Sequence, residues 1–128
     1  MIVATWRAFW ADVVAVSRTA DWSSPRLATH ATGRVLERLR GQFRGLAERG
    51  WVTRGTIRLL HPRAVDLKAT TAKLRDCVDT ARFVRVDRAT GRAIDKIGGA
   101  PDDQTATLVR QAGAWKVEQT VVTGKCAG

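Results

Sequence analysis

The stretch that decides the fold is residues 34–60, RVLERLRGQFRGLAERGWVTRGTIRLL, because its hydrophobic period changes at Gly50. Before Gly50 the apolar residues recur at helical spacing, which predicts a helix over 34–49. They are Val35, Leu36, Leu39, Phe43 and Leu46. Gly50 stands where a left-handed C-terminal cap belongs. After Gly50 the period becomes two and β-branched residues become common, which predicts strands.

Upstream of this stretch the sequence predicts two more helices. Residues 2–20 carry a wide apolar stripe at helical spacing, formed by Ile2, Trp6, Phe9, Val13 and Val16 with Val3, Trp10 and Val14 beside them. Ser24-Pro25 is a helix start signal, and a short helix follows through Leu27 to about His30. Thr32-Gly33 ends it.

Downstream, the pattern predicts strands only. They are expected near 51–60, 64–69, 71–78, 81–88, 104–112 and 115–123, with a break at His61-Pro62, a turn at 87–91, a brief strand continuation at 92–96, a loop at 97–103 and a tight hairpin at 111–114. Helices followed by antiparallel strands exclude a doubly wound fold. The sequence therefore predicts an α+β fold: three N-terminal helices packed on a strongly curved antiparallel sheet, in a single domain over 1–128. The first helix is expected on the concave side, with a pocket between helix and sheet.

Composition limits the classes of protein that remain. The chain has 128 residues, 45% apolar and 27% charged, which is a globular balance. Its longest apolar stretch, 2–17, is interrupted by Arg7 and Asp12, so we expect no membrane span and no signal peptide.

The chain is strongly basic, with 22 Lys and Arg against 12 Asp and Glu and a net charge of +10. Such a charge attracts polyanions. The basic residues are, however, spread from Arg7 to Lys125 without forming a run. This spacing favours a solvated surface. Nucleic acid is an unlikely partner that the charge alone does not exclude.

Cys77 and Cys126 form either a disulfide or two free thiols, and we expect the disulfide. It would close a loop of about 50 residues, which stabilises the fold by about 4 kcal/mol in the chain-entropy account. It would also indicate an oxidising compartment. Two cysteines at this separation, with only His30 and His61 as histidines, match no zinc spacing, so no metal site is expected.

Several motifs resemble a known group of proteins. They are Ser17-Arg18-Thr19-Ala20-Asp21 with Pro25, Ala31-Thr32-Gly33, Leu60-His61-Pro62-Arg63, Asp76-Cys77-Val78-Asp79 and the closing Gly113-Ala114-Trp115-Lys116-Val117. Together with the element order, they resemble the nuclear transport factor 2-like superfamily, which includes SnoaL-like cyclases and ketosteroid isomerases. They are most similar to mature domains of actinobacterial lipoproteins of unassigned function. The resemblance covers nearly the whole chain and implies a cystatin-like cone.

The resemblance also bears on location. In those lipoproteins a signal peptide and a lipidated cysteine precede the domain, whereas here Met1 opens the first helix. We expect an extracellular or cell-envelope protein from the cysteine pair and the resemblance. The alternative is a cytoplasmic protein, if Met1 is the natural start.

Enzymes of this superfamily place an Asp or His in the cone, often with a tyrosine that stabilises an oxyanion. This chain has no tyrosine. The weak candidates for a catalytic group are Asp12, His30 and His61, each with a structural alternative as an ion-paired helix residue or a turn histidine. Trp6 and Trp10 on the first helix are the candidates for lining a ligand pocket, with core packing as their alternative.

The sequence thus favours a non-enzymatic domain that binds a ligand or a protein in an apolar pocket between the first helix and the sheet. The alternative is a small-molecule cyclase or isomerase that uses an Asp or His in the cone. No cofactor is expected. The expected partners are a small apolar ligand or another protein, and the chain is expected to be a monomer or a homodimer.

Overall fold

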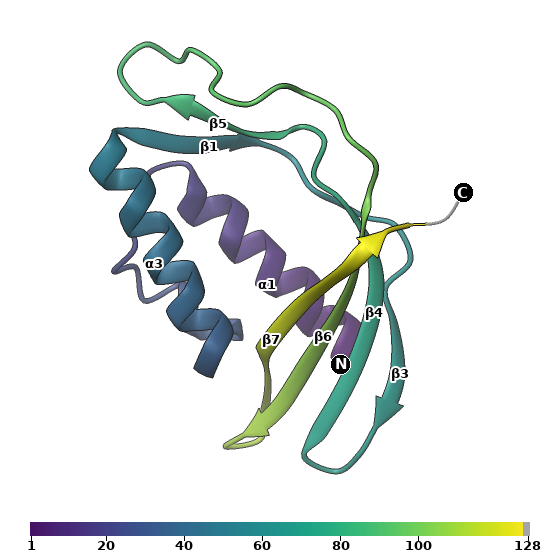
Figure 1. The fold of residues 1–128 in the computed structure, drawn as a ribbon. Coiled ribbons are helices and arrows are strands. Elements are labelled where there is room, and N and C mark those ends of the chain that lie inside the picture. The colour runs from purple at the N-terminus through teal and green to yellow at the C-terminus, as the bar shows by residue number, and fades with distance from the viewer. Residues whose placement is uncertain (127–128) are drawn as a thin grey trace.

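The computed structural model describes residues 1–126, which form three helices followed by seven strands (Figure 1). The elements are α1 Ile2–Ser17, α2 Leu27–His30, α3 Gly33–Arg49, β1 Trp51–Gly55, β2 Arg58–Leu59, β3 Arg63–Leu67, β4 Thr71–Asp79, β5 Phe83–Asp87, β6 Asp102–Gln111 and β7 Ala114–Lys125. The predicted α+β fold, with helices first and antiparallel strands after them, is confirmed.

The strands form two antiparallel sheets on either side of the helices. The main sheet has the order β2-β4-β6-β7, and β3 pairs with the same edge of β4 as β2 does. β1 and β5 form a separate two-stranded sheet. α1 and α3 both contact β1 and β7, so they fill the space between the two sheets (Figure 1).

The main sheet curves because β7 carries two bulges. Its register against β6 shifts between Asp103 and Gln104 and again between Thr107 and Leu108, which leaves Thr123 and Glu118 as extra residues of β7. A bulge bends its strand and increases the local twist. β7 therefore wraps around the helices instead of running flat beside β6, and the sheet is bent as the sequence predicts.

The prediction of one strand over 51–60 is wrong. The chain leaves the small sheet after Gly55 and joins the main sheet at β2. Gly55 has φ +113°, and a Cβ there would lie 1.8 Å from the carbonyl oxygen of Arg82. A glycine is thus required where β1 meets β5, and the strand breaks at it. The expected strand at 92–96 is likewise reduced to a single bridge between Val86 and Ala93.

The helix ends follow local backbone chemistry. The predicted cap at Gly50 is confirmed, with φ +70° and its amide bonded to carbonyls of the last turn of α3. α1 ends at Ser17, three residues before the predicted end, because Ala20 adopts φ +53° and its amide bonds back to the Val16 carbonyl. Left-handed residues of this kind end helices.

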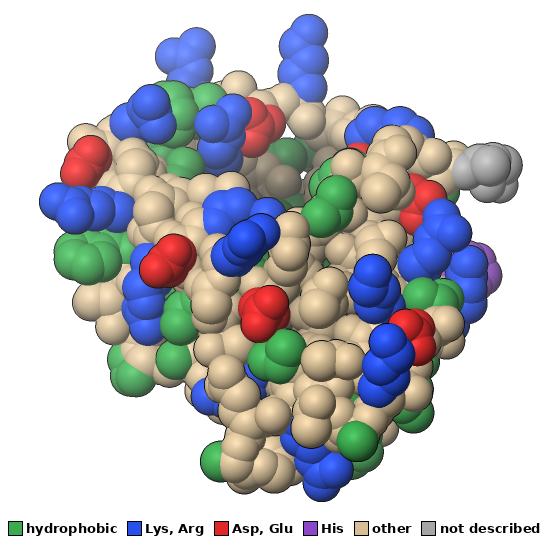
Figure 2. All heavy atoms as spheres, turned by 60° about the horizontal axis from the view of Figure 1, so that its bottom comes forward, with side chains coloured by type: hydrophobic (Ala, Val, Ile, Leu, Met, Phe, Trp, Pro, Cys, Tyr) green, Lys and Arg blue, Asp and Glu red, His purple; other side chains and the backbone are tan. Residues whose placement is uncertain are grey.

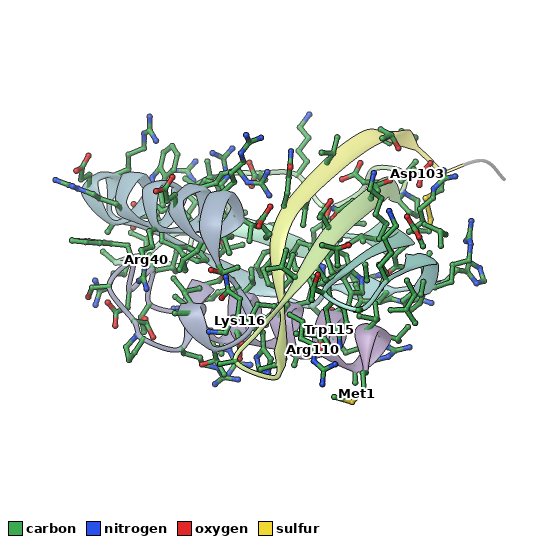
Figure 3. The ribbon with its side chains drawn as sticks, turned by 90° about the horizontal axis from the view of Figure 1, so that it is seen from below. Met1, Arg40, Asp103, Arg110, Trp115 and Lys116 are labelled. Carbon is green, nitrogen blue, oxygen red and sulfur yellow. A yellow bond between two sulfur atoms is a disulfide. The ribbon has the colours of Figure 1, made fainter. Side chains whose placement is uncertain are left out.

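One core holds the helices and the main sheet together. Its buried side chains come from α1, α2, α3, β4, β6 and β7, and Trp6, Leu74, Leu108 and Val117 are fully enclosed. At the lower end, Trp115 and Arg110 of the β6–β7 hairpin lie beside the first residues of α1 and line a shallow hollow with them (Figure 3). None of the described helices is long and apolar enough to cross a bilayer.

Candidate ligand-binding cavity

The fold leaves an inner cavity of about 480 Å³ between α1, α3 and the sheets. This volume lies within the range of about 300–1,000 Å³ that is typical of small-molecule sites. The apolar lining comes from both helices and from β5 and β7: Phe9, Trp10, Val13, Leu39, Phe43, Leu46, Phe83 and Val122. The polar lining residues are Ser17, Arg38, Gln42, Thr53, Thr80, Gln104 and Thr120.

Two polar atoms in this lining are buried without a hydrogen-bond partner among the described residues. They are Nε1 of Trp10 and Oε1 of Gln104. Gln104 is only 6% exposed, and it follows the first bulge of the β6–β7 pair. A buried polar atom that lacks a partner costs about 1–3 kcal/mol. The two residues line the cavity, while the two atoms themselves are covered by neighbouring groups.

Arg38 carries the only charge among the described residues that line the cavity. Its guanidinium donates one hydrogen bond to the main-chain oxygen of Thr120, at 3.1 Å, and another to the Thr120 hydroxyl. These bonds span from α3 to β7 and hold the exposed Arg38 side chain at the edge of the cavity.

Of the two predicted pocket tryptophans, Trp10 lines the cavity and Trp6 lies behind it. Trp6 is fully buried, and its Nε1 donates to Oδ2 of Asp76 at 2.9 Å. Its ring stacks on Phe9 at 5.7 Å and meets Trp10 edge-on at 5.8 Å. Trp6 therefore positions the residues that line the cavity.

Asp12 and His30, two of the three candidates for a catalytic group, contact each other outside the cavity. Nδ1 of His30 lies 2.7 Å from Oδ2 of Asp12, and Nε of Arg26 donates to Oδ1 of Asp12 at 2.9 Å. Asp12 is 7% exposed, because α2 and the segment before it fold over this side of α1. The carboxylate thus joins α1 to α2, a geometry that the spacing in the sequence does not reveal.

His61 is exposed and lies beside the disulfide. Its main-chain amide donates to Oδ1 of Asp76 at 2.8 Å, so Asp76 holds both α1, through Trp6, and the chain before β3. The predicted disulfide forms between Cys77 and Cys126, with a Cα–Cα distance of 6.0 Å. It crosses β6 and fastens the end of β7 to β4.

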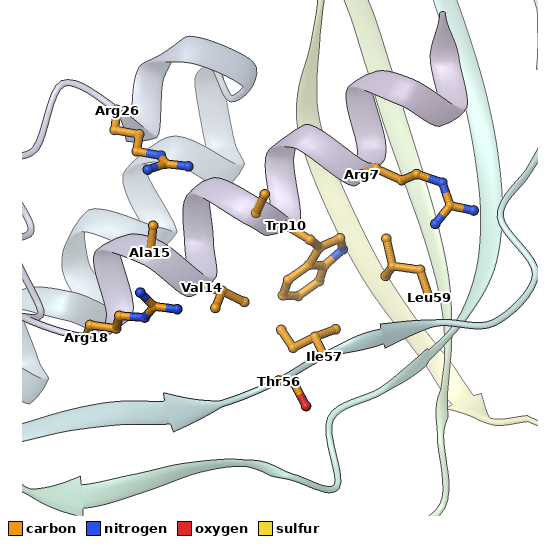
Figure 4. Close-up of a pocket in the computed structure, with 10 residues that line it drawn as sticks. Arg7, Trp10, Val14, Ala15, Arg18, Arg26, Thr56, Ile57 and Leu59 are labelled. Carbon is orange, nitrogen blue, oxygen red and sulfur yellow. The ribbon is translucent and has the colours of Figure 1, made fainter.

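A second hollow lies on the other side of α1 (Figure 4). This outer groove has a volume of about 560 Å³ and an apolar floor of Trp10, Ala11, Val14, Ala15, Ile57 and Leu59, with Thr56 at its edge. Arg7 stands at one end and Arg18 and Arg26 at the other (Figure 4). Trp10 lines both the inner cavity and the outer groove, so the two hollows share this residue.

Charge over the rest of the surface is mixed. Figure 2 shows Lys and Arg side chains distributed over one face with acidic and apolar side chains between them. Among the described residues, the ion pair with the most hydrogen bonds joins Arg85 to Asp95, where the guanidinium makes bonds of 2.6 to 3.1 Å to both carboxylate oxygens. Chiefly through these bonds, Arg85 lowers the pKa of Asp95. Among the described residues, no three His, Cys, Asp or Glu gather in a way that could hold a metal ion.

Of the lining residues, only Trp10 was predicted from the sequence, and Gln104 and Arg38 are two functional ones that were missed. Gln104 occupies an inward position of β6 with Ala106 and Leu108, and a polar residue in an inward series is a signal that could have been used. Arg38 gives no such signal, because it is one of several arginines on the polar side of α3.

Comparison with known proteins indicates the fold alone. No protein-family model matches the chain, and no curated protein matches it. The intermembrane space region of the chloroplast protein ARC6 is similar in structure, with a TM-score of 0.51 and 14% identity, covering 92% of this chain and 97% of that one. A protein of unknown function with a cystatin-like fold from Nostoc punctiforme has a TM-score of 0.49 and 12% identity, covering 89% and 84%.

Proposed function

We propose that this protein binds a small, largely apolar molecule in the inner cavity. The observation that carries the proposal is the lining of this cavity, which is apolar except for a few polar residues, among them the buried Gln104, whose Oε1 has no partner among the described residues. An apolar lining with a few convergent polar groups is typical of ligand sites. After a small rotation of each side chain, the indole N–H of Trp10 would donate to an oxygen of the ligand, and the amide oxygen of Gln104 would accept from a ligand hydroxyl or N–H.

Binding is favoured over catalysis by the chemistry of the lining. General acid–base catalysis needs a group that gains or loses a proton. None of the described lining residues is Asp, Glu, His, Cys, Tyr or Lys. Asp12 and His30 bind each other elsewhere, and His61 lies beside the disulfide. The cyclase or isomerase alternative would thus have to use a base from outside the cavity.

We further propose a relationship to the nuclear transport factor 2-like and SnoaL-like proteins, and to the mature domains of actinobacterial lipoproteins. Helices enclosed by a bent antiparallel sheet support it, as do the motifs at Leu60-His61-Pro62-Arg63 and Asp76-Cys77. The Cys77–Cys126 disulfide is compatible with an extracellular or envelope location, which is the location we propose.

The test is a titration with N-phenyl-1-naphthylamine, a neutral apolar dye whose fluorescence rises in apolar surroundings. Wild-type protein should bind it saturably, near one equivalent. Leu46→Trp should abolish binding, because Leu46 lines the cavity and an indole there would fill it. Leu36→Trp is the matched control, since Leu36 is also half-buried on α3 but does not line the cavity. Absence of saturable dye binding, or equal binding by both variants, would refute the proposal.

A second candidate function is docking of an acidic protein segment in the outer groove. Three arginines stand around its apolar floor; Arg26 is paired with Asp12, whereas Arg7 and Arg18 form no salt bridge with a described residue. An apolar side chain flanked by carboxylates would match this arrangement. A peptide of that pattern should bind more weakly to Arg7→Gln and Arg18→Gln variants and at higher salt. Binding that is indifferent to both changes would exclude this candidate.

A further inference from the structure

The ligand of the inner cavity can be specified more closely from its one charged lining residue. Arg38 lies at the edge of the cavity with an exposed side chain that is bonded to β7, whereas Gln104, on the neighbouring strand β6, is buried. A guanidinium is positively charged at every pH of biological interest. The charge is not neutralised within the site, because no described lining residue is acidic and no described acidic side chain forms a salt bridge with Arg38.

The guanidinium is also held in place. Two of its N–H groups bind the carbonyl and hydroxyl oxygens of Thr120, a residue that itself lines the cavity and is 9% exposed. A guanidinium has five N–H donors, so three remain available. An arginine fixed in this way loses little side-chain entropy when it binds an anion, which makes it a better anion site than a freely moving surface arginine.

From this we infer that the natural ligand is an amphipathic monocarboxylic acid. Its apolar body lies in the inner cavity and its carboxylate is bound by Arg38 at the edge. The inference rests on the proposed function of the cavity. A carboxylate fits the remaining donors of a guanidinium with two parallel hydrogen bonds. A dianionic phosphate would call for a second positive charge, and Arg38 is the only charged residue among the described ones that line the cavity.

The experiment compares decanoate with its methyl ester as competitors of bound N-phenyl-1-naphthylamine at pH 7.5. The two differ only in the charge of the head group. The wild type should bind decanoate at least about ten-fold more tightly than the ester, because a hydrogen bond to a charged group is worth about 1.5–3 kcal/mol. Arg38→Gln should weaken decanoate binding by about ten-fold and leave ester binding within about two-fold.

Arg54→Gln is the matched control. It makes the same charge change on β1, next to the cavity residue Thr53, but Arg54 is exposed and does not line the cavity. Both competitors should bind this variant as they bind the wild type. Decanoate should also bind less tightly as the pH falls below the carboxyl pKa of about 4–5, whereas ester binding should not change.

The outcomes separate the two claims. Equal affinity for acid and ester, equal weakening of both by Arg38→Gln, or failure of both to displace the dye would overturn the acid inference while leaving the cavity as a binding site. If the dye itself fails to bind, the cavity proposal is refuted and the acid inference with it.

Discussion

Replacing Gln104 by methionine should stabilise the protein, although most substitutions of buried residues destabilise. Oε1 of Gln104 is buried in the cavity wall without a hydrogen-bond partner among the described residues, and the residue is 6% exposed. Methionine has a similar length and a flexible apolar side chain that fills irregular spaces. The change therefore removes a desolvated acceptor without opening a new void.

The size of the effect follows from that acceptor. A buried acceptor without a partner costs about 1–3 kcal/mol, so the free energy of unfolding should rise by about that amount. With a urea m-value of about 1–3 kcal/mol per M, the midpoint of unfolding should rise by about 1 M. Ligand affinity should fall at the same time, because the methionine thioether is a much weaker hydrogen-bond acceptor than the amide oxygen of Gln104.

Urea denaturation followed by tryptophan fluorescence measures the stability, and dye titration measures the affinity. Gln119→Met is the control, since Gln119 lies on β7, is half-buried and does not line the cavity. It should change neither quantity appreciably. A loss of stability greater than about 1 kcal/mol in Gln104→Met would refute the reasoning, because it would mean that the amide is already satisfied in the free protein.

Three further predictions concern the disulfide, the strand break at Gly55 and the ion pair between Arg85 and Asp95. Replacing both Cys77 and Cys126 by serine should lower the free energy of unfolding by about 4 kcal/mol, because the disulfide closes a loop of about 50 residues. Urea denaturation measures this change, and a loss below about 1 kcal/mol would contradict the prediction. Gly55→Ala should lower the free energy of unfolding by about 1–3 kcal/mol in the same assay, because the residue has φ +113° and no room for a Cβ. An unchanged free energy of unfolding would show that the strand break does not depend on this glycine. Hydrogen bonds from Arg85 lower the pKa of Asp95, so their stabilising contribution is present above the ordinary carboxyl pKa and is lost as the pH falls through the lowered value. The amide of Arg85 donates to Asp95, so its NMR shift should report this titration below about pH 3.8, and an invariant shift would contradict the assignment.

The sequence predicts the elements of this fold better than their connections. Helical spacing places α1 and α3, and Gly50 marks the end of α3, because these features depend on residues within a few positions of one another. The division of residues 51–60 between two sheets depends on a contact between Gly55 and the carbonyl of Arg82. Such a contact joins parts of the chain that no local pattern relates.

The same distinction applies to the site. Trp10 was predicted because it lies on the apolar stripe of α1 that must face the sheet. Asp12 and His30 were each singled out, but their contact requires α2 to fold back over α1, and this depends on the turn between the helices. Arg38 becomes distinctive only through Thr120, 82 positions away in the chain.

The cavity has the same cause as the curvature. In the β6–β7 pair, the bulge between Asp103 and Gln104 adds Thr123 to β7. The strand bends there, and Gln104, Thr120 and Val122 face a space that the side chains of α1 and α3 do not fill. The spacing of apolar residues indicates which face of a helix or strand is buried. It does not indicate whether the space beside that face is filled by other side chains. In the sequence such a site leaves a polar residue in an inward series, as Gln104 does on β6, but Asp76 on β4 has the same pattern and binds Trp6 and the chain before β3 instead.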